Sequence, residues 1–306
     1  MAVTEVDAAV ALRLSHLTVS YGSARGIVDI SMDVPDAGVT GLLGSNGAGK
    51  TTLLRAALDL VHPTSGSVSV RGVDSRNPMA RSELTYLPGD LVLPGRLNGW
   101  AVLRRYTAGR APLDPARVRG IADRLEIDLD RPVAQLSKGN RQKVGLLLAF
   151  APRARLLMLD EPTSGLDPLL QREFGGLVRE ATSEGAAILL SSHVLSELED
   201  LADRVAVLRE GSLVAYETID QLRDRAASRV AIRFLGPAEA AQFAARDLGP
   251  SALDVEVAGD WVRISFVGDV DPLIKAAAPF HLRSVESIGG DLDDVLMSFY
   301  GSGEGQ

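Results

Sequence analysis

The residues with the clearest potential for chemistry lie in GSNGAGKTT, which runs from Gly44 to Thr52. Glycines let the backbone approach an anion closely, and a helix that begins here adds N–H groups and the positive end of its dipole. The spacing G-x-x-x-x-G-K-[ST] predicts a phosphate-binding loop, because a plain glycine turn would explain neither the lysine nor the hydroxyls. We expect Lys50 to reach the β- and γ-phosphates and Thr51 to offer its hydroxyl to Mg²⁺. The candidate phosphate contacts are Gly44, Ser45, Asn46, Gly47, Ala48, Gly49, Lys50, Thr51 and Thr52.

Two adjacent carboxylates form a second candidate site. The pattern LLMLDEP is that of a buried strand that ends in Asp160 and Glu161 and is stopped by Pro162. Asp160 is suited to hold Mg²⁺, whereas Glu161 projects differently and is suited to polarise an attacking water. Alone, the pair would indicate an acidic cap of the following helix. Together with the phosphate loop, it favours hydrolysis of a phosphate bond.

The elements that must position these residues alternate between buried strands and helices. Apolar runs such as GVTGLLG, RLLMLD and AAILLSS are separated by helical patterns at 50–61, 143–151 and 168–182. This order predicts an α/β fold with a mostly parallel sheet and helices on its faces. Alternating strands near the start indicate an added antiparallel piece, which makes the sheet mixed. Residues 97–131 are rich in Arg, Ala and Leu and predict a helical subdomain.

A change of pattern near Arg225 indicates a second, smaller domain. Residues 229–300 give the order strand, helix, strand, strand, helix, strand, with one more helix at 291–300. That order is typical of an α+β domain of ferredoxin-like type. We therefore expect one domain at 10–225 and an accessory domain at 226–300.

Composition excludes several other chemistries. The 306 residues include no cysteine, so disulfides and thiolate catalysis are ruled out, and the four histidines are too far apart in sequence for a metal-ligand spacing. The net charge of −8 and the pI of about 5.1 argue against sequence-independent nucleic-acid binding. No apolar run approaches the roughly 18 residues needed to span a bilayer. If the protein acts at a membrane, a partner protein must therefore hold it at the membrane surface.

With the phosphate loop and the acidic strand end identified, the chain resembles the nucleotide-binding subunit of an ATP-binding cassette (ABC) transporter over roughly residues 10–220. LSKGN at 136–140 sits where the family signature belongs, SGLD at 164–167 resembles the D-loop, and SSH at 191–193 resembles the switch-histidine segment. Tyr21 matches the aromatic residue that stacks on adenine, an ordinary surface or core tyrosine being the alternative. The resemblance implies a P-loop NTPase domain of ABC type.

The resemblance also implies that two chains sandwich two ATP molecules, each site combining the loop of one chain with the signature of the other. Ser137 and Gly139 match the signature positions that contact the γ-phosphate across the dimer. Asp167 would span the dimer interface, and it could also cap the helix that starts at Pro168. His193 would hydrogen-bond the γ-phosphate or the attacking water, an ordinary core histidine being the alternative.

Three positions depart from the family pattern. Lys138 supplies the backbone N–H that its position needs, and its charge costs roughly 0.3–1 kcal/mol at a helix N-terminus, which bound ATP can offset. Asn140 is one methylene shorter than the usual glutamine, which weakens the expected ribose contact. Gly89 stands where the family has a glutamine that senses the transport partner, and Asp90 beside it is either a substitute or a solvated loop acid.

The function that the resemblance implies is ATP hydrolysis by a homodimer that drives transport through a separate integral-membrane permease. The permease would contact residues between about Leu87 and Tyr106 and would hold the chain on the cytoplasmic side of the cell membrane. The sequence looks like the branch that exports drugs, antibiotics, lipids or polysaccharides.

Two other classes of protein fit the sequence less well. The first alternative is a soluble ABC-type ATPase that acts on ribosomes or DNA, and the single phosphate loop and the acidic charge argue against it. A regulatory subunit with an inactive ATP site is opposed by the presence of Lys50, Asp160, Glu161 and His193. The accessory domain carries no catalytic pattern, and we expect it to stabilise the dimer or regulate its closure.

Overall fold

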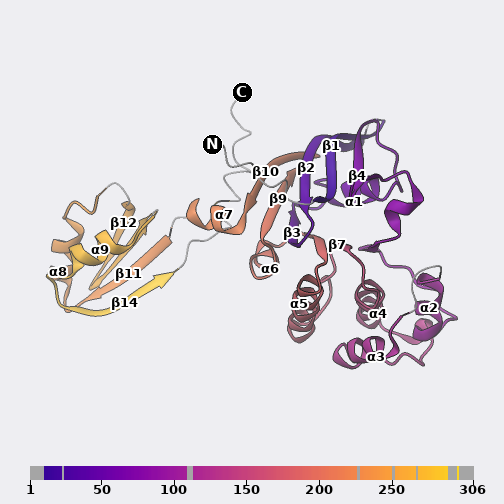
Figure 1. Cartoon of the computed structure of the whole chain (residues 1–306). Coiled ribbons are helices and arrows are strands. Elements are labelled where there is room, and N and C mark those ends of the chain that lie inside the picture. The colour runs from indigo at the N-terminus through magenta and orange to yellow at the C-terminus, as the bar shows by residue number, and fades with distance from the viewer. Residues whose placement is uncertain are drawn as a thin grey trace, which may run out of the picture. The chain divides into compact units, whose positions relative to one another are not determined.

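The structure is a computed structural model that describes residues 10–22, 24–108, 113–225, 228–249, 252–266, 268–288 and 295 (Figure 1). Contacts divide the chain into two compact units, Met1–Tyr216 and Glu217–Gln306. The boundary after residue 225 that the sequence suggests stays a prediction. Each unit has its own hydrophobic core.

A six-stranded sheet forms the centre of the first unit. Its strands, in spatial order, are β10 (Ser212–Thr218), β9 (Arg204–Arg209), β3 (Gly38–Leu43), β8 (Ala187–Ser192), β7 (Leu156–Asp160) and β6 (Leu84–Leu87). Neighbouring strands from β9 to β6 are parallel. Every residue of β7 and β8 is buried, as expected for strands covered on both faces. The predicted parallel sheet is confirmed.

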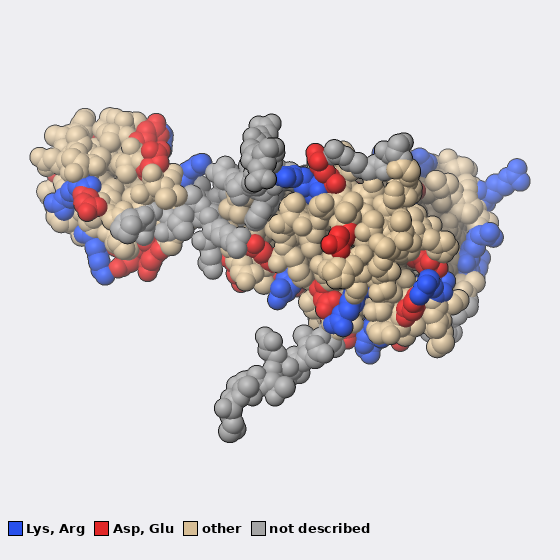
Figure 2. All heavy atoms as spheres, turned by 90° about the horizontal axis from the view of Figure 1, so that it is seen from above, with Lys and Arg blue, Asp and Glu red and all other residues tan. Residues whose placement is uncertain are grey.

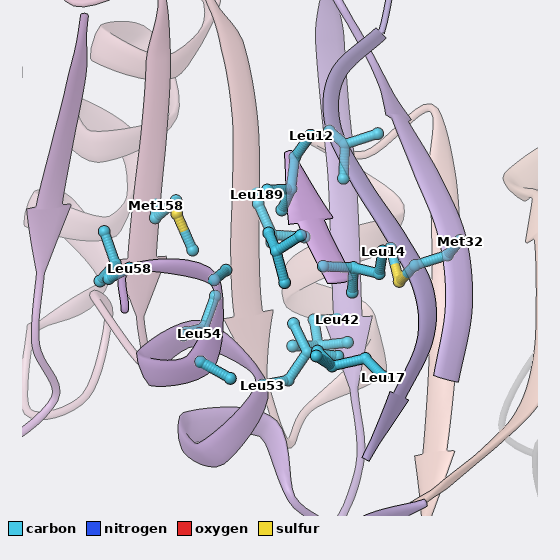
Figure 3. Close-up of a cluster of buried hydrophobic side chains, with 14 of the residues drawn as sticks. Leu12, Leu14, Leu17, Met32, Leu42, Leu53, Leu54, Leu58, Met158 and Leu189 are labelled. Atoms are coloured by element: carbon cyan, nitrogen blue, oxygen red, sulfur yellow. The ribbon is translucent and has the colours of Figure 1, made fainter. Parts of the chain in front are cut away.

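A second, antiparallel sheet lies against one face of the first. Its order is β2 (Ala24–Pro35), β1 (Val10–Tyr21), β4 (Ser65–Val70) and β5 (Val73–Asp74). Helix α1 (Lys50–Ala57) packs between the sheets, and Figure 3 shows Leu53 and Leu54 among leucines and methionines from both. The first residues of α1 are therefore fixed by burial of its apolar side.

The remaining helices of the first unit pack beyond the parallel sheet. Helices α4 (Lys138–Phe150) and α5 (Pro168–Ser183) meet through the rings of Phe150 and Phe174. Helices α2 (Gly99–Tyr106) and α3 (Pro115–Arg124) lie beside α4 at one end, as Figure 1 shows. The shorter helical elements are η1 (Pro78–Arg81), η2 (Val133–Gln135) and α6 (Leu195–Glu199). Within the described ranges, no helix has the length and apolarity needed to cross a bilayer.

The segment around α2 has a small apolar core of its own. It comprises Leu93, Val102, Val133, Leu136 and Val144. The predicted helical segment 97–131 contains two separate helices, each begun by a capping side chain, Asn98 for α2 and Asp114 for α3. This local core holds the start of α4, where the signature-like residues lie.

The second unit begins at Glu217, in the last residues of β10, continues with α7 (Ile219–Arg225) and contains a four-stranded antiparallel sheet. The elements run β11 (Ser228–Phe234), α8 (Pro237–Ala244), β12 (Ala252–Ala258), β13 (Trp261–Phe266), α9 (Asp271–Ala277) and β14 (Leu282–Ile288). The sheet order is β12-β13-β11-β14, and three phenylalanine rings, Phe234, Phe243 and Phe280, meet in its core. The predicted helix at 291–300 lies outside the described residues apart from Val295.

Candidate nucleotide-binding site

The predicted phosphate loop connects the end of β3 to the start of α1. Gly47 and Gly49 have left-handed φ angles of 85° and 107°, which glycine adopts without strain. At Gly49 a Cβ would also come within 2.7 Å of the Ile27 side chain, so the loop passes too close to β2 for any larger residue. Ser45, Asn46 and Gly47 are exposed at the tip of the loop. The backbone thus forms an open turn at a helix N-terminus, which is the geometry that binds anions.

Lys50 lies inside this turn rather than in solvent. Its side chain is only 6% exposed, and its ammonium donates to the carbonyl oxygen of Gly44 at 2.5 Å. The same nitrogen is 3.1 Å from Glu161 Oε1. A buried ammonium needs such partners. Here they hold the positive charge of Lys50 between the phosphate loop and the carboxylate of Glu161.

Asp160 is the best placed residue to hold a metal ion. Its carboxylate is buried and accepts hydrogen bonds from Thr51 Oγ1 at 2.9 Å and from Ser191 Oγ at 2.7 Å. Mg²⁺ prefers oxygen ligands and takes one or two carboxylates together with substrate phosphates. The adjacent hydroxyl of Thr51 and carboxylate of Asp160 fit that ion.

Glu161 has a different environment although it is the next residue. Its φ of 48° is left-handed, and its backbone N–H donates to Ser191 Oγ at 3.0 Å. This turn directs the carboxylate between Lys50 and His193, whose Nδ1 is 2.7 Å from Glu161 Oε2. Because a carboxylate only accepts, His193 donates from Nδ1. Non-glycine residues in this conformation cluster at functional sites.

The signature-like segment begins helix α4. Ser137 is the N-cap, and its hydroxyl accepts from the backbone N–H of Asn140 at 3.2 Å. Gly139 lies in the first turn, and Lys138 is exposed beside it. The helix start that the sequence indicates is therefore present.

Two further candidates lie at the edges of other elements. Asp167 caps α5, accepting from the backbone N–H groups of Leu169 and Leu170, both at 3.0 Å. The predicted capping role is thus observed, whereas the interface role stays a prediction. Tyr21 ends β1 with 46% of its surface exposed, and its stacking on a base also stays a prediction.

A cavity of about 560 Å³ opens beside the carboxylates. Its lining includes Thr51, Asp160 and Glu161, and also Lys138, Arg141 and Gln142 near the start of α4. Ser137, Gly139 and Asn140 of the same chain are outside the part of its lining that the structure describes. We expect ligand phosphates to occupy this space, since the Thr51 hydroxyl and the carboxylates of Asp160 and Glu161 border it.

The sequence reasoning missed the supporting residues. Ser191 binds both carboxylate residues, and Gln142 donates from Nε2 to the carbonyl oxygen of Pro162 at 3.2 Å. The signal for Ser191 is a hydroxyl residue at the end of a fully buried strand, where it must find a partner. The parallel register places Ser191 opposite Asp160.

A phosphate loop between strand and helix, with an acidic strand end next to it in a parallel sheet, defines a P-loop nucleoside-triphosphatase. A family model described as ABC transporter matches residues 27–164. Bacitracin transport ATP-binding protein BcrA of Bacillus licheniformis is 33% identical over 227 residues, covering 70% of this chain and 72% of BcrA. The chain belongs to the family of ABC transporter ATP-binding proteins, and it is the ATPase component.

Two other comparisons extend this result. Nod factor export ATP-binding protein I of Sinorhizobium fredii is 33% identical over 261 residues, covering 82% of this chain and 75% of that protein. A solved structure of an ATP-binding subunit of an ABC transporter superposes with a TM-score of 0.65 at 29% identity, covering 70% of this chain and 92% of that one. The predicted family and ATPase activity are confirmed.

Proposed function

We propose that this chain hydrolyses ATP to drive export of a drug, antibiotic, lipid or polysaccharide through a separate permease. The observation that carries the proposal is the cluster in which Lys50 forms an ion pair with Glu161, and His193 a hydrogen bond with it, beside Thr51 and Asp160. Export is supported by the relatives, one named for bacitracin transport and one for Nod factor export.

The roles of the site residues follow from their surroundings. Lys50 and the loop N–H groups bind the β- and γ-phosphates, and Thr51 with Asp160 holds Mg²⁺, which neutralises phosphate charge. Glu161 orients and polarises the attacking water, and His193 fixes its carboxylate through the 2.7 Å contact. Lys50 also lies against Glu161, so phosphate binding that draws Lys50 away frees this carboxylate for water.

We propose further that two copies enclose two ATP molecules. Among the described lining residues of the cavity in their own chain, Ser137, Gly139 and Asn140 are not present, as expected for residues that act on a partner's nucleotide. Tyr21 would stack on the adenine. ATP bound between the copies favours the closed dimer, and hydrolysis removes that preference. We propose no nucleic-acid partner. In Figure 2, acidic and basic side chains are interspersed on the visible face, whereas a nucleic-acid site requires clustered basic residues.

The permease contact is proposed at an apolar groove of about 490 Å³. Its lining includes Leu87, Leu91, Val92 and Tyr106, within the segment that the sequence suggests. Docking there would hold the chain on the cytoplasmic side of the membrane. We assign the second unit to the ferredoxin-like type, supported by its β-α-β-β-α-β order and antiparallel sheet, and give it a role in dimer stability or closure.

The test is Glu161→Gln in the full chain. Loss of a general base slows turnover by roughly 10²–10⁴-fold, while ATP binding is retained. Gel filtration with ATP would then show a trapped dimer. Glu173→Gln, at a half-buried position of α5 whose carboxylate pairs with Arg124 and not with a site residue, is the matched control and keeps wild-type turnover. Continued hydrolysis by Glu161→Gln would remove Glu161 from the catalytic role.

A further inference from the structure

The basic residues of the first unit are unevenly distributed along the chain. Residues 91–113 contain no acidic residue, and their four basic residues are Arg96, Arg104, Arg105 and Arg110. The segment thus has a formal charge of +4 in a chain whose net charge is −8. Arg110 lies outside the described residues, whereas the other three arginines are exposed. Residues 91–113 are therefore a locally positive part of an acidic protein.

The three described arginines of this segment have no partner within the part of the chain that the structure describes. Arg96, Arg104 and Arg105 take part in none of its hydrogen bonds or ion pairs. By contrast, Arg13, an exposed arginine of β1, forms an ion pair with Asp33 at 2.8 Å. A guanidinium is always charged and has five N–H donors. The donors of the three unpaired arginines are therefore available to an anion from outside the chain.

The helix beside α2 contributes no negative charge to this region. Helix α4 lies next to α2 (Figure 1), and the two share the apolar core that contains Val102 and Val144. Residues 131–159, which include all of α4, contain no acidic residue and have six basic ones, Arg131, Lys138, Arg141, Lys143, Arg153 and Arg155. Helix α4 therefore does not neutralise the arginines of α2.

A few acidic residues do lie close to the segment. The Trp100 N–H donates to the carbonyl oxygen of the residue between Asp128 and Asp130, at the start of α2. The two arginines of α2 follow Trp100 by four and five residues, or about 6–8 Å along the helix, which is comparable to the screening length in physiological salt. Asp90 borders the apolar groove. These acids are fewer than the basic residues of 91–113 and 131–159, so the region stays positive.

Aromatic side chains flank the two arginines of α2. Trp100 is half-buried and precedes Arg104 by one helical turn, on the same side of the helix, and Tyr106 is 48% exposed. Tyr106 and Val92 border the apolar groove proposed for the permease, whereas Arg104 and Arg105 are not among its described lining residues. Basic and aromatic side chains together are typical of segments at a membrane–water interface. A permease in the groove would leave these arginines facing the lipid beside it.

We propose that the exposed arginines of residues 91–113 bind the headgroups of anionic phospholipids, so that the chain contacts the lipid surface directly beside the permease. This inference rests on the proposed function, which places the groove against a permease. A guanidinium can donate two parallel hydrogen bonds to one phosphate. Near an anionic leaflet, each arginine strengthens binding by about fivefold, and salt weakens this attraction.

Vesicle co-sedimentation of the full chain, without nucleotide or permease, tests the inference. Vesicles with about one third phosphatidylglycerol in phosphatidylcholine are compared with vesicles of phosphatidylcholine alone. We expect the chain to bind the anionic vesicles about tenfold more strongly or better. Raising the salt to about 0.5 M should remove most of this preference, because the charges are then screened over a shorter distance.

A pair of double variants separates the arginines of α2 from the charge of the whole chain. Arg104→Gln with Arg105→Gln should weaken binding to the anionic vesicles by about tenfold or more. Replacing both by lysine should retain most of the binding, because the attraction depends on charge. Arg172→Gln with Arg179→Gln, at exposed positions of α5, changes the net charge equally and should alter binding by less than about twofold. Thermal unfolding of each variant checks that the fold is unchanged.

Three results would overturn the inference. The first is a wild-type chain without preference for anionic vesicles, and the second is equal weakening in both glutamine double variants. The third is unchanged vesicle binding by Arg104→Gln with Arg105→Gln together with lost co-purification of the permease, which would make these arginines a protein contact. None of them bears on ATP hydrolysis, since the Glu161→Gln turnover tests that separately. A chain that binds vesicles as expected but hydrolyses no ATP would contradict the proposed function alone.

Discussion

At the scale of single residues, a change of backbone conformation separates the two acidic side chains. Asp160 ends β7 in the buried position that strand geometry dictates, where Thr51 and Ser191 bind it. Glu161 then adopts a left-handed φ of 48°, and its carboxylate faces Lys50 and His193 instead. Neighbouring carboxylates thus acquire different partners, and they can serve different steps of one reaction.

Ser191 is the residue whose removal should show how these positions are maintained. In Ser191→Ala, Asp160 loses a donor and the Glu161 N–H loses an acceptor, so we expect a loss of about 1–3 kcal/mol in the free energy of unfolding. The rate of ATP hydrolysis should fall more than ATP affinity, because the Glu161 N–H loses one of its two hydrogen bonds to Ser191. Denaturant unfolding and steady-state ATPase measurements check both. Ser183→Ala, at an exposed serine, is the control, and equal effects of the two changes would contradict this role.

Much of the site was predictable at this scale because it depends on local spacing. The loop residues follow one another along the chain, and Lys50 and Thr51 are placed by the helix that they begin. The contacts of Ser191 and Gln142 were not predictable, because they depend on which strands pair and in which register. The groove beside Asp90 likewise arises only when β6, α4 and the residues that follow α1 pack together.

At the scale of elements, residues assigned to ATP by resemblance also begin helices. Ser137 caps α4 and Asp167 caps α5. Replacing either therefore removes a cap as well as any contact with nucleotide, and stability and activity must be measured together.

Ser137→Ala and Asp114→Ala form a matched pair for this purpose, since both remove an N-cap of a helix in the same unit. Each should cost about 1 kcal/mol of stability in denaturant unfolding. Only Ser137→Ala should reduce the ATPase rate strongly. The same loss of activity in both variants would show that Ser137 acts by capping alone.

The elements themselves were predicted well where patterns are long and apolar, as in β7, β8 and α5. The alternating strands at the start were correctly expected to be antiparallel. The break between α2 and α3 was less visible, because both helices draw on the same Arg- and Ala-rich composition; α2 ends at Tyr106, and α3 begins after its N-cap, Asp114. That cap could have been recognised from the Asp-Pro pair at 114–115.

At the scale of the whole molecule, the two units differ in what they contribute. The first contains the complete set of ATP-site candidates, and the second has its own aromatic core and, among the residues that the structure describes, no comparable group. We expect a chain ending at residue 225 to bind ATP with near wild-type affinity, because all candidate ligands remain. Its dimerisation or ATPase rate should change. Gel filtration of the Glu161→Gln variant in both lengths of chain compares dimerisation, and steady-state assays of both lengths without that substitution compare the ATPase rates. If neither dimerisation nor the rate differs, the second unit does not have the proposed role.

One consequence of helix α1 reaches beyond the site. Its first three residues belong to the phosphate loop, while Leu53 and Leu54 belong to the interior shared by both sheets. Selection for tighter or weaker nucleotide affinity can therefore act through apolar positions such as Leu12 or Met32, which never meet the ligand. For the same reason, bound nucleotide should protect this interior against heat and proteolysis. A ligand held by the first residues of α1 thereby stabilises the apolar core into which the same helix packs.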